Sequence, residues 1–219
     1  KKSNLYKCFS NKLNHTILYL MILIKHRVNK AKELKNTDKN FGIEIDLRSE
    51  GKNIILHHDP FKKGELFRHW IKNYNHKLLV LNVKEEGLEK KIIKILKKNK
   101  IKNFFFHDQT FSTLIKNMNL TNVSIRYSEF EEIKKKKFLF SKIKWVWIDN
   151  FTKFNLDKKF YIFLKKKKIK ICIVSPELTN IKRVKEIFKN ILYIKKNNLK
   201  IDAVCTKKTS IWKKYLKLL

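Results

Sequence analysis

Short apolar runs recur along the whole chain, with polar stretches between them. Nine of these runs are rich in β-branched and aromatic residues, and they cover residues 17–24, 42–47, 53–56, 77–83, 103–106, 122–125, 145–148, 169–174 and 201–205. Several runs are continuous rather than alternating, which is typical of strands that are buried on both faces. The pattern therefore predicts a mainly parallel sheet.

Lysine-rich amphipathic stretches lie between many of these runs. In residues 87–100, Leu88, Ile92 and Leu96 follow helical spacing and lysines occupy the other face; residues 183–194 repeat this pattern. Strands that alternate with helices predict an α/β fold with short right-handed crossovers. We therefore predict a single (β/α)8 TIM-type barrel domain over residues 1–219.

Nine runs are one too many for an eight-stranded barrel. The segment Ser49-Glu50-Gly51-Lys52 has the composition of a hairpin turn, so the runs before and after it are expected to form a small β-hairpin extension. The most apolar run, residues 17–24, is shorter than the roughly 20 residues of a membrane helix. No small-residue cleavage site follows it, so we expect a buried strand rather than a signal peptide.

The net charge of +34 comes from 53 Lys and Arg against 19 Asp and Glu. Such charge can be a footprint for nucleic acid, anionic lipid or glycan. It also fits the codon bias of an A- and T-rich genome, which the content of 4 Gly and 2 Pro favours. Arginine, the preferred bidentate phosphate ligand, is scarce. Nucleic-acid binding is therefore not expected, whereas peripheral contact with an anionic membrane or glycan stays open.

The three cysteines, Cys8, Cys172 and Cys205, are far apart and form no CxxC motif. This spacing argues against a zinc site and against a disulfide framework. Cys172 and Cys205 lie within apolar runs, where we expect them to be small core residues. A reducing, cytoplasmic location follows from the unpaired cysteines.

Segments that carry polar side chains capable of catalysis or ligand binding lie at the carboxyl ends of the apolar runs. They are His26 and Arg27; Glu44 and Asp46; His57, His58, Asp59 and Pro60; Asn82, Val83 and Lys84; His107 and Asp108; Arg126, Tyr127, Ser128 and Glu129; Asp149; Ser175, Pro176 and Glu177; and Thr206 and Lys207. In a β/α barrel these ends converge on one face, where active sites are built. The arrangement therefore predicts an active mouth.

Glu44 and Asp46 are two residues apart on a predicted strand, so their side chains point to the same side. Two carboxylates in one mouth repel each other unless a cation lies between them. Their oxygens suit a hard divalent ion such as Mg²⁺ or Ca²⁺. The alternative is a pair of surface carboxylates bound to lysines, but the flanking His26 and His58 favour the metal.

Two histidines beside one metal suit phosphodiester chemistry, because one imidazole can remove a proton and the other can protonate the leaving alkoxide. Arg27 and Lys84 can hold the non-bridging oxygens. His57 and His58 face opposite sides of an extended strand, so one of them enters the mouth. The remaining candidates for structural histidines are His15, His69 and His76.

The order His-Arg, Glu-x-Asp, His-Asp-Pro and x-x-Lys resembles the glycerophosphodiester phosphodiesterase family, whose superfamily includes the phosphatidylinositol-specific phospholipases C. The resemblance implies a β/α barrel, a divalent metal and hydrolysis of a glycerol-phosphate or sugar-phosphate diester. It assigns His26 and His58 as the catalytic pair, Glu44 and Asp46 as metal ligands, and Arg27 and Lys84 as phosphate-side cations. We add Arg126 as a phosphate ligand, and Asn82 and Asp108 as metal ligands.

The resemblance covers the front half of the chain, to about Lys84. Segments 126–131, 145–151 and 174–178 resemble a small divergent bacterial branch of the superfamily. Val28 replaces the family's glycine, the connection from Arg27 to Glu44 lacks a Glu-Asn-Thr segment, and Asn82 replaces a third acidic ligand. An uncharged amide weakens metal affinity. The alternatives are therefore an impaired barrel that binds an anionic phosphorylated ligand, and a basic nucleic-acid or membrane-surface protein.

Overall fold

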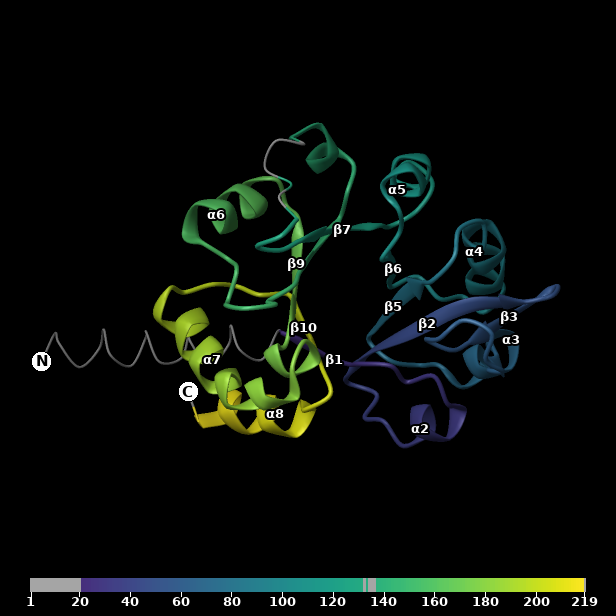
Figure 1. Cartoon of the computed structure of the whole chain (residues 1–219), viewed down its shortest axis with the longest axis horizontal. Helices are drawn as coiled ribbons and strands as arrows, with labels where there is room; N and C mark the ends of the chain where they lie inside the picture. The colour runs from purple at the N-terminus through teal and green to yellow at the C-terminus, as the bar shows by residue number, and fades with distance from the viewer. Residues whose placement is uncertain (1–20, 132, 134–136, 219) are drawn as a thin grey trace, which may run out of the picture.

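The computed structural model describes residues 21–131, 133 and 137–218. Within them, a 10-stranded sheet contains a ring of parallel strands and an antiparallel extension. The ring consists of β1 (Ile22–Lys25), β2 (Gly42–Glu50), β5 (Leu78–Val83), β6 (Phe104–His107), β7 (Ser124–Tyr127), β8 (Trp145–Ile148), β9 (Lys170–Val174) and β10 (Ala203–Thr206) (Figure 1). Parallel ladders join β6 to β7 through β5, β2, β1, β10, β9 and β8, and the bridge between Phe106 and Val123 joins β6 to the start of β7 on the other side, so the predicted TIM-type barrel is confirmed.

The junction between β6 and β7 is the seam of this ring. One isolated bridge, between Phe106 and Val123, joins the two strands. Side chains extend the junction: Asn122 Nδ2 donates to the Phe104 carbonyl at 3.3 Å, and Ser124 Oγ donates to the Phe106 carbonyl at 3.2 Å. The seam therefore depends on side-chain hydrogen bonds where the other junctions have backbone ladders.

A hairpin extends from the end of β2. This strand continues to Glu50, turns at Gly51 and Lys52, and pairs antiparallel with β3 (Asn53–Leu56), which pairs in turn with the short β4 (Glu65–Leu66). Gly51 has a φ of 56°, a conformation that glycine adopts at little cost. The predicted hairpin extension is therefore confirmed.

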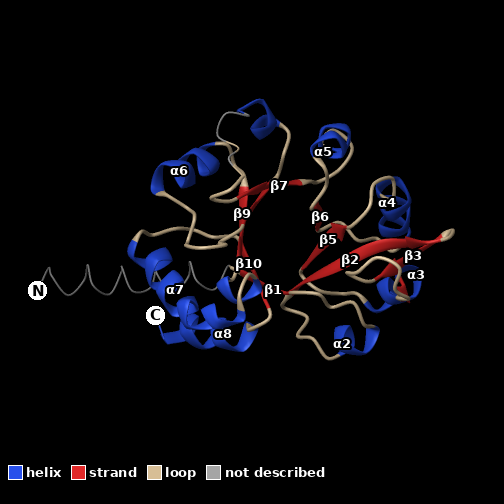
Figure 2. Cartoon of the chain, in the orientation of Figure 1, coloured by secondary structure: helices blue, strands red, loops and turns tan. Residues whose placement is uncertain are grey.

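Helices surround the ring of strands (Figure 2). They are α2 (Ala31–Lys35), α3 (Phe67–Trp70), α4 (Glu89–Lys98), α5 (Phe111–Asn117), α6 (Lys158–Lys166), α7 (Glu186–Lys196) and α8 (Thr209–Leu218), with the 3-10 helices η1 (Ile71–Asn73), η2 (Lys137–Ser141), η3 (Pro176–Leu178) and η4 (Ile181–Lys185). The helix predicted at 87–100 is α4, and that predicted at 183–194 is η4 followed by α7. Within the described residues, no helix is long and apolar enough to cross a membrane.

Three of these helices are followed by a residue in the left-handed conformation that is not glycine. The residues that take the left-handed conformation just after α4, α6 and α7 are Lys100, Lys168 and Asn198, with φ of 58°, 56° and 50°. Helices usually place glycine at this position, because a Cβ atom is unfavourable there. A chain with 4 Gly in total therefore uses lysine and asparagine for the same turn.

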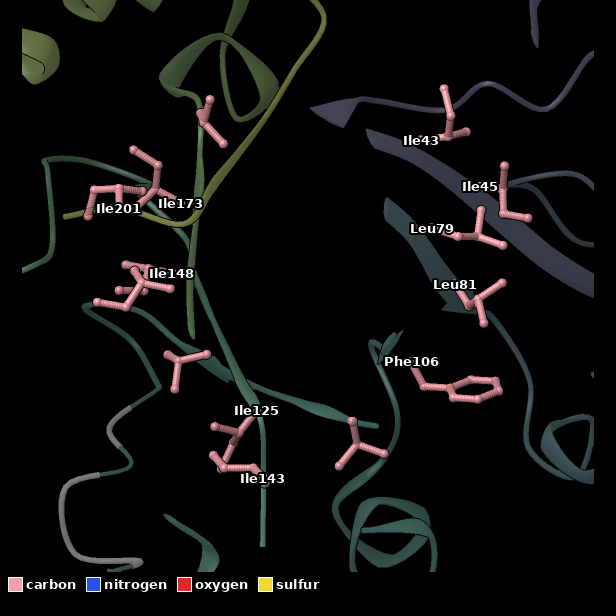
Figure 3. Close-up of a cluster of buried hydrophobic side chains, with 14 of the residues drawn as sticks. Ile43, Ile45, Leu79, Leu81, Phe106, Ile125, Ile143, Ile148, Ile173 and Ile201 are labelled. Atoms are coloured by element: carbon pink, nitrogen blue, oxygen red, sulfur yellow. The ribbon is translucent and has the colours of Figure 1, made fainter. Parts of the chain in front are cut away.

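The hydrophobic core has an outer and an inner part. Residues such as Ile45, Leu81 and Ile173 point from the strands toward the surrounding helices (Figure 3). Inside the barrel, Phe105 stacks on Trp145 with ring centroids 4.7 Å apart. Cys172 also belongs to the inner cluster. The prediction that Cys172 and Cys205 are buried, unpaired core residues is confirmed.

The first predicted strand lies partly outside the described residues. Its run, 17–24, overlaps β1 at residues 22–24, whereas residues 17–20 belong to the part that is not described, as do Cys8 and His15. The assignment of residues 1–219 to one domain stays a prediction.

Candidate active site

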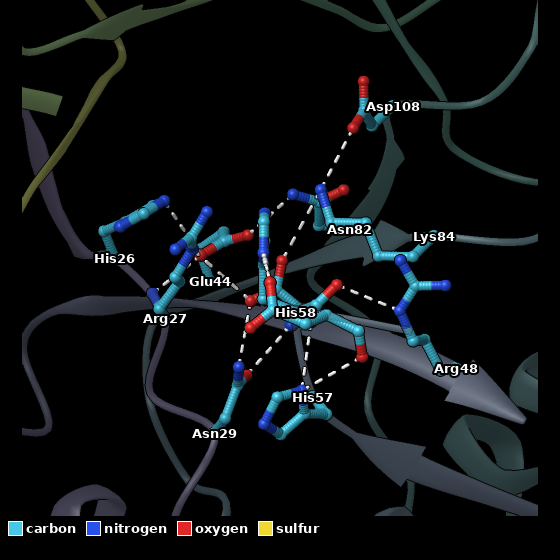
Figure 4. Close-up of polar contacts among 12 residues, drawn as sticks. His26, Arg27, Asn29, Glu44, Arg48, His57, His58, Asn82, Lys84 and Asp108 are labelled. Atoms are coloured by element: carbon cyan, nitrogen blue, oxygen red, sulfur yellow. Dashed lines mark hydrogen bonds and ion pairs between the residues drawn. The ribbon is translucent and has the colours of Figure 1, made fainter. Parts of the chain in front are cut away.

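Polar side chains from six neighbouring strands form one continuous chain of contacts at the carboxyl ends of the ring. In order around the barrel, the strands and residues are β1 with His26 and Arg27 just beyond it, β2 with Glu44 and Asp46, β5 with Asn82 and Lys84 just beyond it, β6 with Asp108 just beyond it, β7 with Arg126, and β8 with Asp149 just beyond it. Figure 4 shows the part of this chain from His26 to Asp108. The structure therefore brings the predicted site residues of these strands together at one mouth.

Glu44 and Asp46 form the buried centre of this chain, since both are almost fully shielded from solvent. Arg27 donates its backbone N–H to Glu44 Oε2 at 2.7 Å, and its Nε lies 3.7 Å from Asp46 Oδ2. Lys84 Nζ lies 3.6 Å from Asp46 Oδ1. The two carboxylates therefore lie buried beside each other, and the cations Arg27 and Lys84 lie near the two carboxylate oxygens of Asp46.

Burial and the neighbouring Asp46 raise the pKa of Glu44 to about 7. His26 Nε2 lies 3.8 Å from Glu44 Oε2, but burial, together with the charges of Arg27, Lys207 and Lys84, lowers the pKa of His26 to about 3. His26 is therefore neutral at physiological pH, and its approach to Glu44 is not an ion pair. A neutral imidazole can accept a proton.

The oxygens of Glu44, Asp46 and Asn82 suit a divalent cation. Asp46 Oδ1 and Asn82 Oδ1 are buried oxygens without a hydrogen-bond partner in the described part of the chain. Asn82 Nδ2 donates to Glu44 Oε1 at 3.1 Å, which directs its amide oxygen away from that carboxylate. Two carboxylates and one amide oxygen are ligands that Mg²⁺ or Ca²⁺ accepts. Among the described residues, no group of three or more His, Cys, Asp or Glu could hold a metal, so any such site here depends on Asn82.

Asp108 lies among cations rather than beside the carboxylate pair. Its Oδ2 accepts from Lys84 Nζ at 3.1 Å, and its Oδ1 accepts from Arg126 Nη1 at 2.8 Å. Arg126 Nε donates to Asp149 Oδ2 at 2.7 Å. The structure thus pairs Asp108 with Lys84 and Arg126, the two predicted phosphate ligands, and the metal ligation that we expected of it stays a prediction.

His58 enters the site from the hairpin extension. Its Nδ1 forms a 2.8 Å hydrogen bond with Asp59 Oδ1, and this bond lowers the pKa of Asp59. The carbonyl of His58 accepts from Arg48 Nε at 2.9 Å. His57, by contrast, accepts the backbone N–H of Asp59 at 3.0 Å, as a structural residue of the turn would.

The departure at Val28 is accommodated by the backbone. The residue with a positive φ is Arg27, at 56°, and this conformation directs its N–H toward Glu44. Val28 is fully buried, and its N–H donates to the Glu44 carbonyl at 2.9 Å. The turn after β1 therefore forms without the glycine that the family uses.

Sequence reasoning did not place Asn29 at the mouth, and it placed Asp59 there without assigning it a role. Asn29 forms hydrogen bonds of 2.9 Å with both Asp46 Oδ2 and the Asp46 backbone N–H. Asp59 binds the ring of His58, as described above. Their positions beside His-Arg and inside His-Asp-Pro were the available signals, but the side-chain contacts depend on loop geometry. Of the other histidines, buried His76 Nε2 lies 3.2 Å from the Thr37 carbonyl, consistent with its predicted structural role.

No family model matches the sequence, and no curated protein matches it. Solved structures do match. A glycerophosphodiester phosphodiesterase from Thermotoga maritima superposes with a TM-score of 0.67 at 16% identity, covering 91% of this chain and 98% of the other. A phosphodiesterase from Oleispira antarctica in complex with the product sn-glycerol-3-phosphate gives 0.64 at 15% identity, with the same coverage of 91% and 98%. A glycerophosphodiester phosphodiesterase from Agrobacterium tumefaciens gives 0.60 at 9% identity, covering 85% and 96%.

Fold and site together define a β/α barrel with a polar mouth at the carboxyl ends of its strands. The particular fold is that of the glycerophosphodiester phosphodiesterases, which confirms the family fold that the sequence motifs implied.

Proposed function

We propose that this chain is a metal-dependent phosphodiester hydrolase of the glycerophosphodiester phosphodiesterase type, acting on a glycerol-phosphate or sugar-phosphate diester. One observation carries the proposal: the buried Glu44 and Asp46 lie between His26 and the cations Arg27 and Lys84 at the mouth. A structural neighbour in complex with sn-glycerol-3-phosphate supports the substrate class.

Glu44, Asp46 and Asn82 would hold one Mg²⁺ or Ca²⁺, which would polarise the phosphoryl group and neutralise developing charge. Arg27 and Lys84 bind non-bridging oxygens and orient phosphorus toward water. His26, neutral because of its burial, accepts the proton of the attacking water. His58 donates a proton to the leaving alkoxide, and Asp59 orients its ring through the contact at Nδ1.

The test is turnover of a panel of glycerol and sugar phosphodiesters, with and without chelator. We expect His26→Ala and His58→Ala each to lower kcat by about a hundredfold to ten-thousandfold, because each removes one proton-transfer group. His69→Ala is the matched control, since His69 is exposed on α3. Turnover that is insensitive both to chelator and to the two histidine substitutions would contradict this mechanism.

A second candidate is a barrel that binds an anionic phosphorylated ligand without hydrolysing it. Asn82 favours this alternative, because an amide in place of a carboxylate weakens metal binding. Phosphate binding at the mouth without turnover on any diester would support it. A cytoplasmic location and peripheral contact with an anionic surface remain predictions.

A further inference from the structure

A solvent-exposed phenylalanine projects from the loop that carries His58. This loop, residues 57–64, starts where β3 ends, and Leu56 of β3 pairs with Leu47, one residue beyond Asp46. The loop therefore leaves the barrel at the level of the candidate active site. Phe61 within it is 104% exposed relative to a free reference residue, and its φ is 58°, a conformation that bulky residues rarely adopt.

The base of this loop is firmly held. Arg48 binds the His58 carbonyl, and Asp59 binds the rings of both His57 and His58. At the other end, a Cβ atom on Gly64 would lie 2.5 Å from the Leu56 carbonyl oxygen, so the chain packs closely against β3 there. Phe61 therefore projects from the tip of an anchored loop. Its ring is exposed to water there, so it contributes no hydrophobic stabilisation to the fold.

A second aromatic group lies on the other side of the mouth, in the loops after β7 and β8. Phe130 is 75% exposed and Phe151 is 41% exposed, and their ring centroids are 5.8 Å apart. Glu129 ties the two loops together, because its Oε1 accepts from both the N–H and the hydroxyl of Thr152, at 2.6 and 2.8 Å. The ring order places β8 opposite β2, so the two aromatic groups face each other across the mouth.

Charge on this face favours an anionic partner. Lys62 and Lys63 follow Phe61 directly, Lys153 lies two residues after Phe151, and all three are exposed. Aromatic rings beside lysines are the combination by which proteins bind the headgroup region of an anionic bilayer, the rings entering the acyl boundary and the lysines attracting the lipid charge.

We propose that the rim surface, formed by Phe61, Lys62, Lys63, Phe130, Phe151 and Lys153, docks the barrel mouth onto an anionic phospholipid bilayer. The consequence for catalysis rests on the proposed function: the diester substrate would then be one presented at a lipid surface. Because Phe61 and His58 share one anchored loop, docking would bring a lipid headgroup next to the candidate catalytic residues.

The first test is co-sedimentation with phosphatidylcholine vesicles with and without phosphatidylserine. We expect binding to the anionic vesicles, weakened about tenfold or more by Phe61→Ser, because a buried aromatic ring is lost. Leu120→Ser is the control, since Leu120 is 60% exposed in the connection before β7, at the opposite end of the barrel. Equal effects of both substitutions, or no binding by the natural chain, would overturn the proposal.

The second test separates local from overall charge. Lys62→Glu with Lys63→Glu should weaken vesicle binding by about twenty-fivefold or more, since each lysine near an anionic surface contributes about fivefold. Lys166→Glu with Lys167→Glu makes the same charge change on exposed residues at the C-terminal end of α6, at the opposite end of the barrel, and should have a much smaller effect. Equal losses would show non-specific attraction and overturn the proposal.

The third test reports insertion directly. The 4 Trp of the chain are all buried, at 5% exposure or less, so an added exposed tryptophan is a distinct probe. The tryptophan of Phe61→Trp should shift its fluorescence emission to the blue with anionic vesicles, and that of Leu120→Trp should not.

Turnover of a water-soluble diester should be unchanged in Phe61→Ser, which separates failure of docking from failure of the proposed function. Loss of self-association in Phe61→Ser, or loss of binding to an anionic glycan in this variant, would assign the surface to another partner and overturn the proposal.

Discussion

Asn29 holds Asp46 at both its carboxylate and its backbone, through two hydrogen bonds of 2.9 Å. One carboxylate oxygen, Oδ2, is engaged by this amide, while Oδ1 remains buried without a hydrogen-bond partner among the described residues. Asn29 therefore sets the direction in which Asp46 presents Oδ1, which lies 3.6 Å from Lys84 Nζ. A side chain that orients a ligand in this way is a positioning residue.

We expect Asn29→Ala to weaken binding of Mg²⁺ or Ca²⁺ by about tenfold to a hundredfold, the usual cost of losing a group that orients a metal ligand. Calorimetric titration of the metal measures this change. Asn40→Ala, which removes an exposed asparagine that binds Asp38, is the matched control. Unchanged metal affinity in a correctly folded Asn29→Ala protein would show that Asp46 is oriented by other contacts.

Asn82→Asp should change thermal stability in opposite directions in the absence and presence of metal. Asn82 donates to Glu44, whose pKa is already raised by burial and by Asp46, so a third carboxylate adds repulsion. We expect the metal-free protein to melt at a lower temperature and the metal to raise Tm more than in the natural chain, because it gains a charged ligand. Thermal unfolding with and without Mg²⁺ or Ca²⁺ measures both. An Asn82→Asp protein that shows the same metal-induced rise in Tm as the natural chain would place Asn82 outside the metal site.

Glycine should stabilise the ends of α4 and α6. Lys100 and Lys168 adopt the left-handed conformation, in which a side chain costs about 1 kcal/mol relative to glycine. We expect Lys100→Gly and Lys168→Gly each to raise the free energy of unfolding by about 0.5–1 kcal/mol. Lys94→Gly, within α4, should lower it by a similar amount. Denaturant unfolding of the three variants provides the comparison, and a loss of stability in the first two would contradict the argument.

His107 should make the protein less stable in acid. Burial lowers its pKa to about 3, despite the nearby Asp108, whereas the unfolded chain has the ordinary value of 6.5. Between these two values the unfolded state binds more protons, so stability falls as the pH is lowered from about 6.5 toward 3, by up to about 1.4 kcal/mol per pH unit.

His107→Gln cannot gain that proton, so its stability should depend less steeply on pH over this range. Chemical unfolding across the pH series measures the difference in slope, which is independent of the stacking on Trp147 that the substitution also removes. Parallel curves for the two proteins would show that His107 is not the group responsible.

The hydrophobic pattern located β8 and β3 with the observed bounds, because in these strands the apolar run and the backbone pairing end at the same residue. It failed at β7, where the predicted strand 122–125 is observed as Ser124–Tyr127. Arg126 ended the apolar run, but the strand continues through it because Asp149 and Asp108 neutralise its charge. A hydrophobic pattern carries no information about such partners.

The sequence was sufficient to predict that the polar residues at the strand ends meet at one mouth of the barrel. The contacts within it depend on loop conformations, such as the positive φ of Arg27 and of Asp108, which turn these residues toward partners on neighbouring strands. Such conformations are unusual for non-glycine residues, so composition and periodicity cannot anticipate them. The pairing of Asp108 with two cations, and the grip of Asn29 on Asp46, follow from this geometry.

The seam between β6 and β7 divides the candidate chemistry unequally. His26, Arg27, Glu44, Asp46, His58, Asn82, Lys84 and Asp108 all precede the start of β7, and Arg126 follows it. A chain cut in the connection between α5 and β7 would therefore give two half-barrels, one with the proposed metal and proton-transfer groups and one with a single phosphate ligand. Reassembly would have to restore few backbone contacts at the cut edge, but the complete β10–β1 ladder at the other. The barrel therefore consists of one half that carries most of the candidate site residues and a second half that completes the ring.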